Sequence, residues 1–190
     1  MKKLAIYSFL SVSALISASS ALAQEDHHAD PHPLEFMFGE WVGEASGVAP
    51  DRTPYSITQT ERVGPMLDGE IVVIEGRGYS AEGETAFNAF AVVSKSGPDG
   101  AWEMRSYTGG RAGTFPFELT PSGYVWSTPA GSNAIVQYTA TFDGDSWSQI
   151  GEYIVDGGEP IQMFQMSLQR VGDSNWPAAN PVAPVLVEQD

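Results

Sequence analysis

The sequence predicts an all-β fold, an up-and-down antiparallel barrel of about ten strands preceded by a short N-terminal helical turn. Residues 34–172 contain short segments in which apolar and polar residues alternate, the pattern of strands with one buried face. Turn dipeptides such as Asp-Gly and Gly-Gly separate them at the spacing of roughly 8–12 residues that is typical of sandwiches and barrels. No helical segment of about 10–15 residues intervenes, which excludes a parallel α/β sheet, and short links in series favour a meander.

The predicted elements follow one another with short connections. Pro33 to Phe38 is an apolar stretch that starts with proline, which predicts a helical turn closing one end of the barrel with Leu34, Phe36 and Phe38. After this turn the alternation and the bounding turn residues predict strands at Trp41–Val48, Tyr55–Val63, Glu70–Tyr79, Thr85–Ser94, Trp102–Thr108, Gly113–Leu119, Tyr124–Thr128, Asn133–Phe142, Trp147–Val155 and Pro160–Val171.

The two ends of the chain are expected to lie outside the barrel. Residues 1–23 have a basic start, an apolar core and a small-x-small ending, so we interpret them as a signal peptide cleaved between Ala23 and Gln24. The protein is therefore expected to be periplasmic or secreted. Residues 24–33 form a polar leader with all three histidines, which we interpret as a flexible solvated segment rather than a metal site. Residues 173–190 are expected to be a flexible Pro-rich tail.

Composition narrows the classes of function. The 190 residues carry a formal net charge of −15, and such an acidic surface repels nucleic acid and anionic membranes. The chain contains no cysteine, which excludes disulfides, thiol catalysis and thiolate metal ligands. No stretch after the signal peptide approaches about 18 apolar residues, so no stable membrane insertion is expected. We expect no cofactor, no metal site, and a monomer or a weak homodimer.

Several segments resemble known barrels. Gly39-x-Trp41 on the first strand and Arg170 on the last resemble the calycin layout of lipocalins, which implies that the tryptophan closes the barrel base and the arginine stacks across it. The segments PLEFMFGEW, QTERV, EGRGY and MRSYTGGRAGTFPFEL resemble a bacterial domain-of-unknown-function family of secreted lipocalin-like barrels. The opening is also distantly similar to nitrobindin, a haem-binding barrel. Its haem ligand is a late histidine, and because this chain has no histidine after His32, no haem is expected.

Charged residues among apolar neighbours form the candidate site. Arginine suits fixed bidentate contacts better than lysine, and six of the basic residues after the signal peptide are arginine. Glu61, Arg77 and Arg105 lie on the second, third and fifth predicted strands, which an antiparallel sheet can bring to a common interior. Arginines with a tyrosine hydroxyl would bind an anionic headgroup, and aromatic residues would wall an apolar pocket. The predicted ligand is a small hydrophobic or amphipathic anion, held by Glu61, Arg77, Arg105, Tyr107, Arg111, Trp126 and Tyr153.

Two other interpretations stay open. Trp41 and Arg170 are assigned to structure under every interpretation. Barrels of this size can be filled by side chains, with Glu–Arg pairs joining strands, so the protein is alternatively a structural or interaction module. It is alternatively a cofactor-free isomerase or cyclase with a Glu/Arg/Tyr site, for which Glu61, Glu75 and Glu152 are the candidate acid–base residues. A Ser–His–Asp triad is excluded because histidine is confined to the leader.

Overall fold

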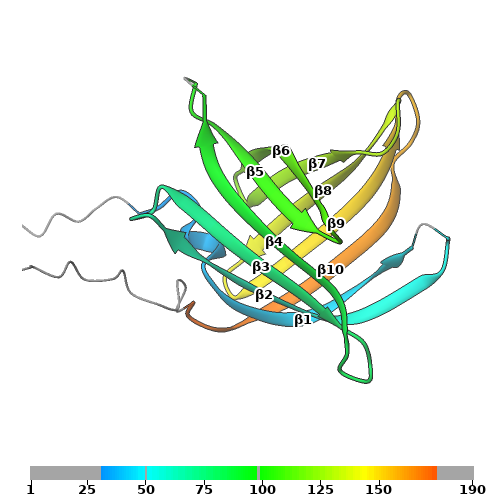
Figure 1. Ribbon diagram of the computed structural model, residues 1–190, viewed down its shortest axis with the longest axis horizontal. Coiled ribbons are helices and arrows are strands. Elements are labelled where there is room, and N and C mark those ends of the chain that lie inside the picture. Colours follow the sequence, from blue (N-terminus) through cyan, green and yellow to red (C-terminus); the bar gives the residue numbers. More distant parts are fainter. Residues whose placement is uncertain (1–30, 50, 98, 175–190) are drawn as a thin grey trace, which may run out of the picture. The chain divides into compact units, whose positions relative to one another are not determined.

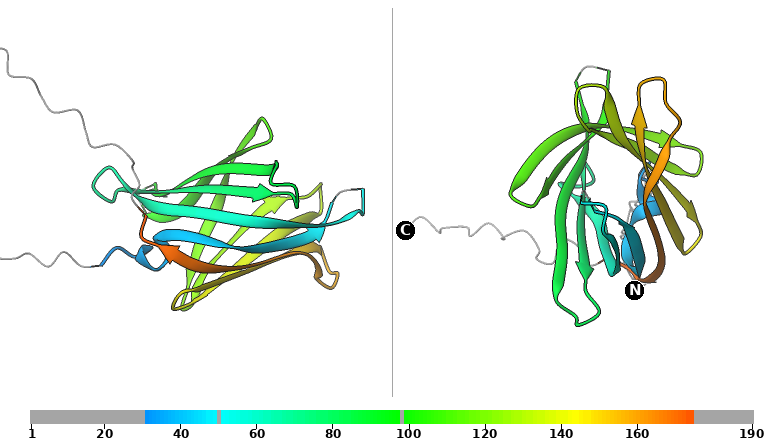
Figure 2. Two further views of the ribbon diagram at one scale, coloured as in Figure 1. Left: turned by 90° about the horizontal axis from the view of Figure 1, so that it is seen from below. Right: turned by 90° about the vertical axis from the view of Figure 1, so that its right-hand side faces the viewer.

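The structure, a computed structural model, describes residues 31–49, 51–97 and 99–174. They form one 3₁₀ turn, η1 (Glu35–Met37), and ten strands: β1 (Gly39–Val48), β2 (Pro54–Met66), β3 (Ile71–Tyr79), β4 (Thr85–Ser96), β5 (Ala101–Thr108), β6 (Arg111–Thr120), β7 (Gly123–Pro129), β8 (Ala134–Asp143), β9 (Ser146–Val155) and β10 (Ile161–Gly172). Each strand pairs antiparallel with its neighbours in sequence, and β1 pairs with β10 (Figure 1). Seen along its axis, the sheet forms a closed ring (Figure 2). The predicted all-β up-and-down barrel is confirmed.

One predicted turn is shorter than expected. The predicted strands Tyr55–Val63 and Glu70–Tyr79 leave residues 64–69 as their connection, but Gly64 and Pro65 continue β2 and pair with β3. The connection contains Leu67, Asp68 and Gly69, all with positive φ (54°, 54° and 90°). A proline fits the ladder here because it stands close to the end of its strand.

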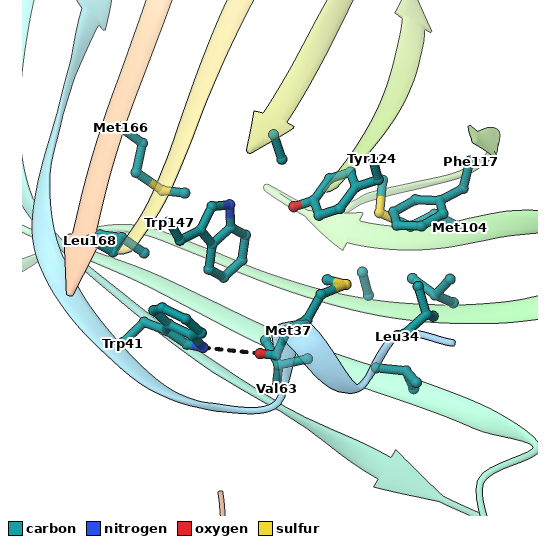
Figure 3. Packing of buried hydrophobic residues seen from close by; sticks show 14 of the residues in the cluster. Leu34, Met37, Trp41, Val63, Met104, Phe117, Tyr124, Trp147, Met166 and Leu168 are labelled. Atoms are coloured by element: carbon teal, nitrogen blue, oxygen red, sulfur yellow. Dashed lines mark hydrogen bonds between the residues drawn. The ribbon is translucent and has the colours of Figure 1, made fainter. Parts of the chain in front are cut away.

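The helical turn closes one end of the barrel, though not with the three predicted residues. Leu34 and Met37 are fully buried, whereas Phe36 is 38% exposed. Residues three apart lie on the same side of a 3₁₀ turn, so Leu34 and Met37 share the face that meets the core. The indole Nε1 of Trp41 donates a hydrogen bond to the Met37 carbonyl at 3.0 Å (Figure 3). We call this end of the barrel the closed end.

Arg170 braces the same end from the last strand. Its Nε and Nη2 donate to the carbonyl of Phe38 at 3.2 and 3.0 Å. The guanidinium passes over Gly39, where a Cβ would stand 2.7 Å from Nε, and Gly39 itself has a φ of +140°. The glycine of the Gly39-x-Trp41 motif is therefore required both by its backbone and by the arginine beside it.

The described chain begins inside the predicted leader. His32 accepts the backbone N–H of Leu34 at Nδ1, 3.0 Å away, which leaves Nε2 to donate to the Gly69 carbonyl at 3.1 Å. The His32 ring also lies 5.4 Å from that of Phe38. The expectation of a solvated segment is therefore wrong for His32. The predicted signal peptide, the rest of the leader and nearly all of the predicted tail lie outside the described residues. No helix among the described residues is long and apolar enough to cross a membrane.

Candidate functional site

The two ends of the barrel differ in how well they are sealed. Alternate residues of each strand face the interior, and at the closed end these side chains are buried. At the opposite end Tyr55, Phe87 and Ile161 occupy inward-facing positions of β2, β4 and β10, yet they are 37%, 41% and 61% exposed. Solvent therefore reaches the interior from this end, which we call the mouth.

A row of aromatic side chains crosses the interior wall between the mouth and the core. The ring of Trp126 stacks on Tyr138 at a centroid distance of 4.4 Å and lies 5.7 Å from Phe115. Tyr138 in turn meets the edge of Phe164 at 5.9 Å. These four rings, the aromatic row, come from β6, β7, β8 and β10 and are only partly buried. They offer flat apolar surfaces on which a ring or chain can pack.

The hydrogen-bonded ladder of the barrel is shortest beside this row, between β6 and β7. The β6–β7 ladder contains only the pairs from Phe117 with Trp126 to Thr120 with Gly123. The first half of β6 and the second half of β7 diverge towards the mouth without pairing across the gap (Figure 1).

Two polar side chains lie on the interior wall of β2. Gln59 Nε2 donates to Glu61 Oε1 at 2.7 Å. Their space comes from two glycines of β3: a Cβ on Gly76 would stand 2.8 Å from a Glu61 oxygen, and one on Gly78 would stand 3.3 Å from Gln59 Oε1. The register pairs Glu61 with Gly76 and Gln59 with Gly78, so each polar side chain lies over the glycine opposite it.

The carboxyl group of Glu61 is perturbed by this position. Part of the residue stays accessible to solvent, but the carboxyl group lies against Gly76 of the neighbouring strand. Burial raises the pKa of Glu61 from 4.5 to about 8; the nearby charge of Glu75 adds to the increase, and the Gln59 hydrogen bond opposes it. Glu61 is therefore mostly protonated at neutral pH and can donate a hydrogen bond.

A second polar pair lies across the barrel on β7 and β9. The Tyr124 hydroxyl donates to Gln149 Oε1 at 3.1 Å, and both residues are at least nine-tenths buried. Both pair with Ala140 of the strand between them, and this small residue leaves room for the two to meet. Burial, helped by the charge of Glu61, raises the pKa of Tyr124 well above its ordinary value, so the hydroxyl stays protonated.

The indole of Trp147 adds an unsatisfied donor. Trp147 is 2% exposed, and its Nε1 has no hydrogen-bond acceptor within the described part of the chain. The ring packs against Trp41 and Phe142, with its nitrogen turned away from Trp41 towards the space that the Tyr124 hydroxyl enters (Figure 3). Leaving a buried donor unpaired costs about 1–3 kcal/mol. We refer to Gln59, Glu61, Tyr124, Trp147 and Gln149 together as the polar layer.

Three residues predicted to face the barrel axis lie on its outside. Arg105 and Tyr107 flank Ser106 on β5 and are exposed, because the inward positions of that strand belong to Met104 and its alternates. Arg105 pairs with Glu103 at 2.6 Å, and Arg77 binds Glu75 from an equally exposed position on β3. The prediction of an interior guanidinium cluster is wrong, because the parity of these strands was assigned incorrectly.

Three of the residues that were predicted to bind the ligand line one groove on the outer surface of the barrel. Arg77, Tyr107 and Arg111 line a groove of about 480 Å³ together with Glu75, beside the loop between β5 and β6. Every one of these four side chains is open to solvent or half-buried, and Glu75 neutralises Arg77. Glu152, the third candidate acid, lies on the outward parity of β9. Exposed ion pairs of this kind contribute little stability, because water screens both charges.

The other predicted ligand residues face inward. Glu61 belongs to the polar layer, Trp126 to the aromatic row, and Tyr153 lies near the mouth opposite Ile161. Reading the sequence missed Gln59, Tyr124 and Gln149 as members of a site, and it considered Trp147 only as one of the aromatic residues that could wall the apolar part of a pocket. The sequence contained a usable signal only for the pair Gln59 and Glu61. Gln59-x-Glu61 on one strand and Gly76-x-Gly78 on the next have the same two-residue spacing, and glycines inside a strand mark a close approach of neighbouring groups.

The polar layer can bind through hydrogen bonds but offers no set of metal ligands. In the residues that the structure describes, no group of three or more His, Asp or Glu side chains is placed to hold a metal ion. The layer combines neutral donors with one carboxyl group of raised pKa, below an apolar and partly open aromatic wall. Such an arrangement can hold an apolar molecule with a polar group, or transfer a proton to or from one.

Comparisons with known proteins bear on the fold alone. No protein-family model matches the chain, and no curated protein matches it in sequence. Among solved structures, the crystal structure of Rv2717c from M. tuberculosis is similar over 73% of this chain and 94% of its own, with 14% identity and a TM-score of 0.55. A protein of unknown function from Nostoc punctiforme, of the DUF3598 family, matches over 73% and 97% with 8% identity, but its TM-score is 0.21. The first similarity agrees with the barrel fold.

Proposed function

We propose that this protein binds a small, largely apolar molecule inside its barrel, with entry through the mouth. The observation that carries the proposal is the difference between the two ends. Exposed apolar surface costs roughly 25 cal/mol per Å², and a barrel serving only as a scaffold would bury its inward-facing side chains at both ends. Here Tyr55, Phe87 and Ile161 face inward and stay exposed, while Leu34 and Met37 seal the other end.

The class and location of the protein are part of the proposal. The Gly39-x-Trp41 and Arg170 contacts support a calycin-like barrel, the class in which ligands enter an open end. Residues 1–23 support export, and mass measurement of the protein from its own host should then give Gln24 as the first residue.

Titration with the uncharged fluorescent probe N-phenyl-1-naphthylamine tests binding. We expect saturable enhancement of probe fluorescence, weakened at least severalfold in W126A, because Trp126 presents a partly exposed face of the aromatic row. The matched control is I135A, which removes an apolar side chain that is 37% exposed on the outer face of β8. Equal affinity in both variants, or no saturable binding, contradicts the proposal, and the second result favours a filled barrel that serves as a structural module.

The isomerase or cyclase hypothesis is kept as a second candidate because of one observation, the raised pKa of Glu61 inside the barrel. A carboxyl group that titrates near pH 8 can act as acid and base near neutral pH. Once a ligand is identified, E61Q separates the two functions: retained binding with lost turnover favours catalysis, and unchanged chemistry in E61Q excludes it.

A further inference from the structure

The polar layer contains one donor that nothing in the described chain satisfies. More than nine in ten buried polar groups in native proteins have a hydrogen-bond partner, so the Trp147 indole N–H is an exception that calls for an explanation. Its nitrogen faces the side of the core on which Tyr124 and Met166 lie, away from Trp41 (Figure 3). The next inward-facing residue of β9 towards the mouth is Gln149, so the donor stands at the boundary between the sealed core and the polar layer.

The polar layer also lacks a cation. None of the basic residues that the structure describes is buried: Arg77 and Arg105 face outward, and Arg111 lines the outer groove. A carboxylate brought to this depth would lose its hydration and would lie near Glu61 with no opposite charge to compensate it. An uncharged oxygen acceptor faces neither penalty.

We propose that the deepest polar group of the bound molecule is an uncharged carbonyl-type oxygen that accepts the indole N–H of Trp147. This inference rests on the proposed function, since it assumes that the barrel interior takes a ligand, and it replaces the anionic headgroup expected from the sequence. The rest of the molecule is apolar and extends along the aromatic row towards the mouth. The ligand class is therefore that of ketones, aldehydes, esters or quinones on an apolar ring or chain.

Three probes of one shape separate the possibilities: 2-acetylnaphthalene has the carbonyl acceptor, 2-isopropylnaphthalene has none, and 2-naphthoate is its anionic counterpart. Each is titrated at pH 6.5 into ¹⁵N-labelled full-length protein, with affinity followed by fluorescence and the tryptophan indole N–H signals by NMR. The Trp147 signal is assigned by its loss in W147F. We expect the ketone to bind at least tenfold more tightly than the isopropyl compound, and the anion most weakly. The Trp147 signal should move downfield with the ketone alone.

The variants make the assignment specific. In W147F the ketone should lose its advantage while the isopropyl compound still binds, because the hydrogen bond is removed and the apolar contacts stay. In the matched control W126F, both affinities should fall but their ratio should persist, since Trp126 offers a packing surface only. If W147F does not fold, the Trp147 signal of the unmodified protein is assigned by triple-resonance NMR instead, and its shift on adding the ketone still decides.

The failures of the two proposals are distinguishable. Equal affinities for the ketone and the isopropyl compound, an unmoved Trp147 signal, or an unchanged ratio in W147F would overturn the carbonyl inference and leave apolar binding intact. Tightest binding of 2-naphthoate would restore an anionic ligand. If none of the three probes binds, the proposed function itself fails.

Discussion

The carboxyl group of Glu61 lies directly against Gly76 of the neighbouring strand. A Cβ built on Gly76 would stand 2.8 Å from Oε1 and 2.9 Å from Oε2. The two residues are register partners, and the glycine therefore keeps a polar side chain against the wall instead of across the interior.

This contact predicts that G76A folds but is destabilised. The added methyl group forces the Glu61 carboxyl away from the wall, and because this group ends a flexible side chain, the cost should stay near roughly 1–3 kcal/mol. Chemical denaturation of G76A, E61A and the double variant measures the coupling. We expect the double variant to be more stable than the sum of the single changes predicts. Additive free energies would contradict the contact.

The raised pKa of Glu61 predicts a dependence of stability on pH. The folded protein binds this proton more tightly than the unfolded chain, so the contribution is complete below about pH 4.5 and is lost as pH rises to about 8. Between pH 6 and 9 the other carboxyl groups have already ionised, so their contribution no longer changes. The free energy of unfolding should still decrease over this range, because Glu61 loses its proton there. In E61Q the same measurement should be flat over this range; an equal slope in both proteins would disprove the assignment.

Gly39 is predicted to tolerate a side chain poorly. G39A combines a φ of +140° with a collision against Arg170 Nε, and we expect a loss of roughly 2–5 kcal/mol in the free energy of unfolding. Gly83 is the matched control, since its φ is +81° but no atom lies within 4 Å of a built Cβ. G83A should cost on the order of 1 kcal/mol. Similar losses in both variants would show that the collision is absent.

Arg105 provides a test of the corrected strand parity. Its side chain is 56% exposed, and its guanidinium pairs with Glu103 on the same outer face. R105A should change the free energy of unfolding by less than about 1 kcal/mol and leave probe affinity unchanged. A severalfold loss of affinity for N-phenyl-1-naphthylamine would place Arg105 in the site after all.

Ala140 is predicted to be limited in size by the Tyr124–Gln149 hydrogen bond. A leucine at this inward position would force the two side chains apart and leave buried polar groups unpaired, which we expect to cost roughly 2–4 kcal/mol. The adjacent outward-facing Thr139 serves as control, and T139L should be close to neutral. Thermal unfolding of the two variants compares them directly.

The sequence alone was sufficient for the fold and insufficient for the site. Alternation and turn dipeptides located all ten strands, because both depend on local residues. Which alternate set faces inward depends on neighbours across the sheet. On β5 the inward set of Trp102 and Met104 competes with an outward set containing Arg105 and Tyr107, and both sets mix apolar and polar groups. The Tyr124–Gln149 pair joins residues 25 apart through a third strand, a relationship with no local signature.

The closure of the barrel has a consequence for how the chain reaches this state. Arg170 binds a carbonyl 132 residues earlier in sequence, so the first and last strands can meet only after the intervening hairpins have brought them together. Topologies dominated by such distant pairings fold slowly, because the loss of chain entropy precedes the gain from contacts. Before that meeting, the outer edges of β1 and β10 are unprotected, and the partly assembled sheet is then most prone to self-association.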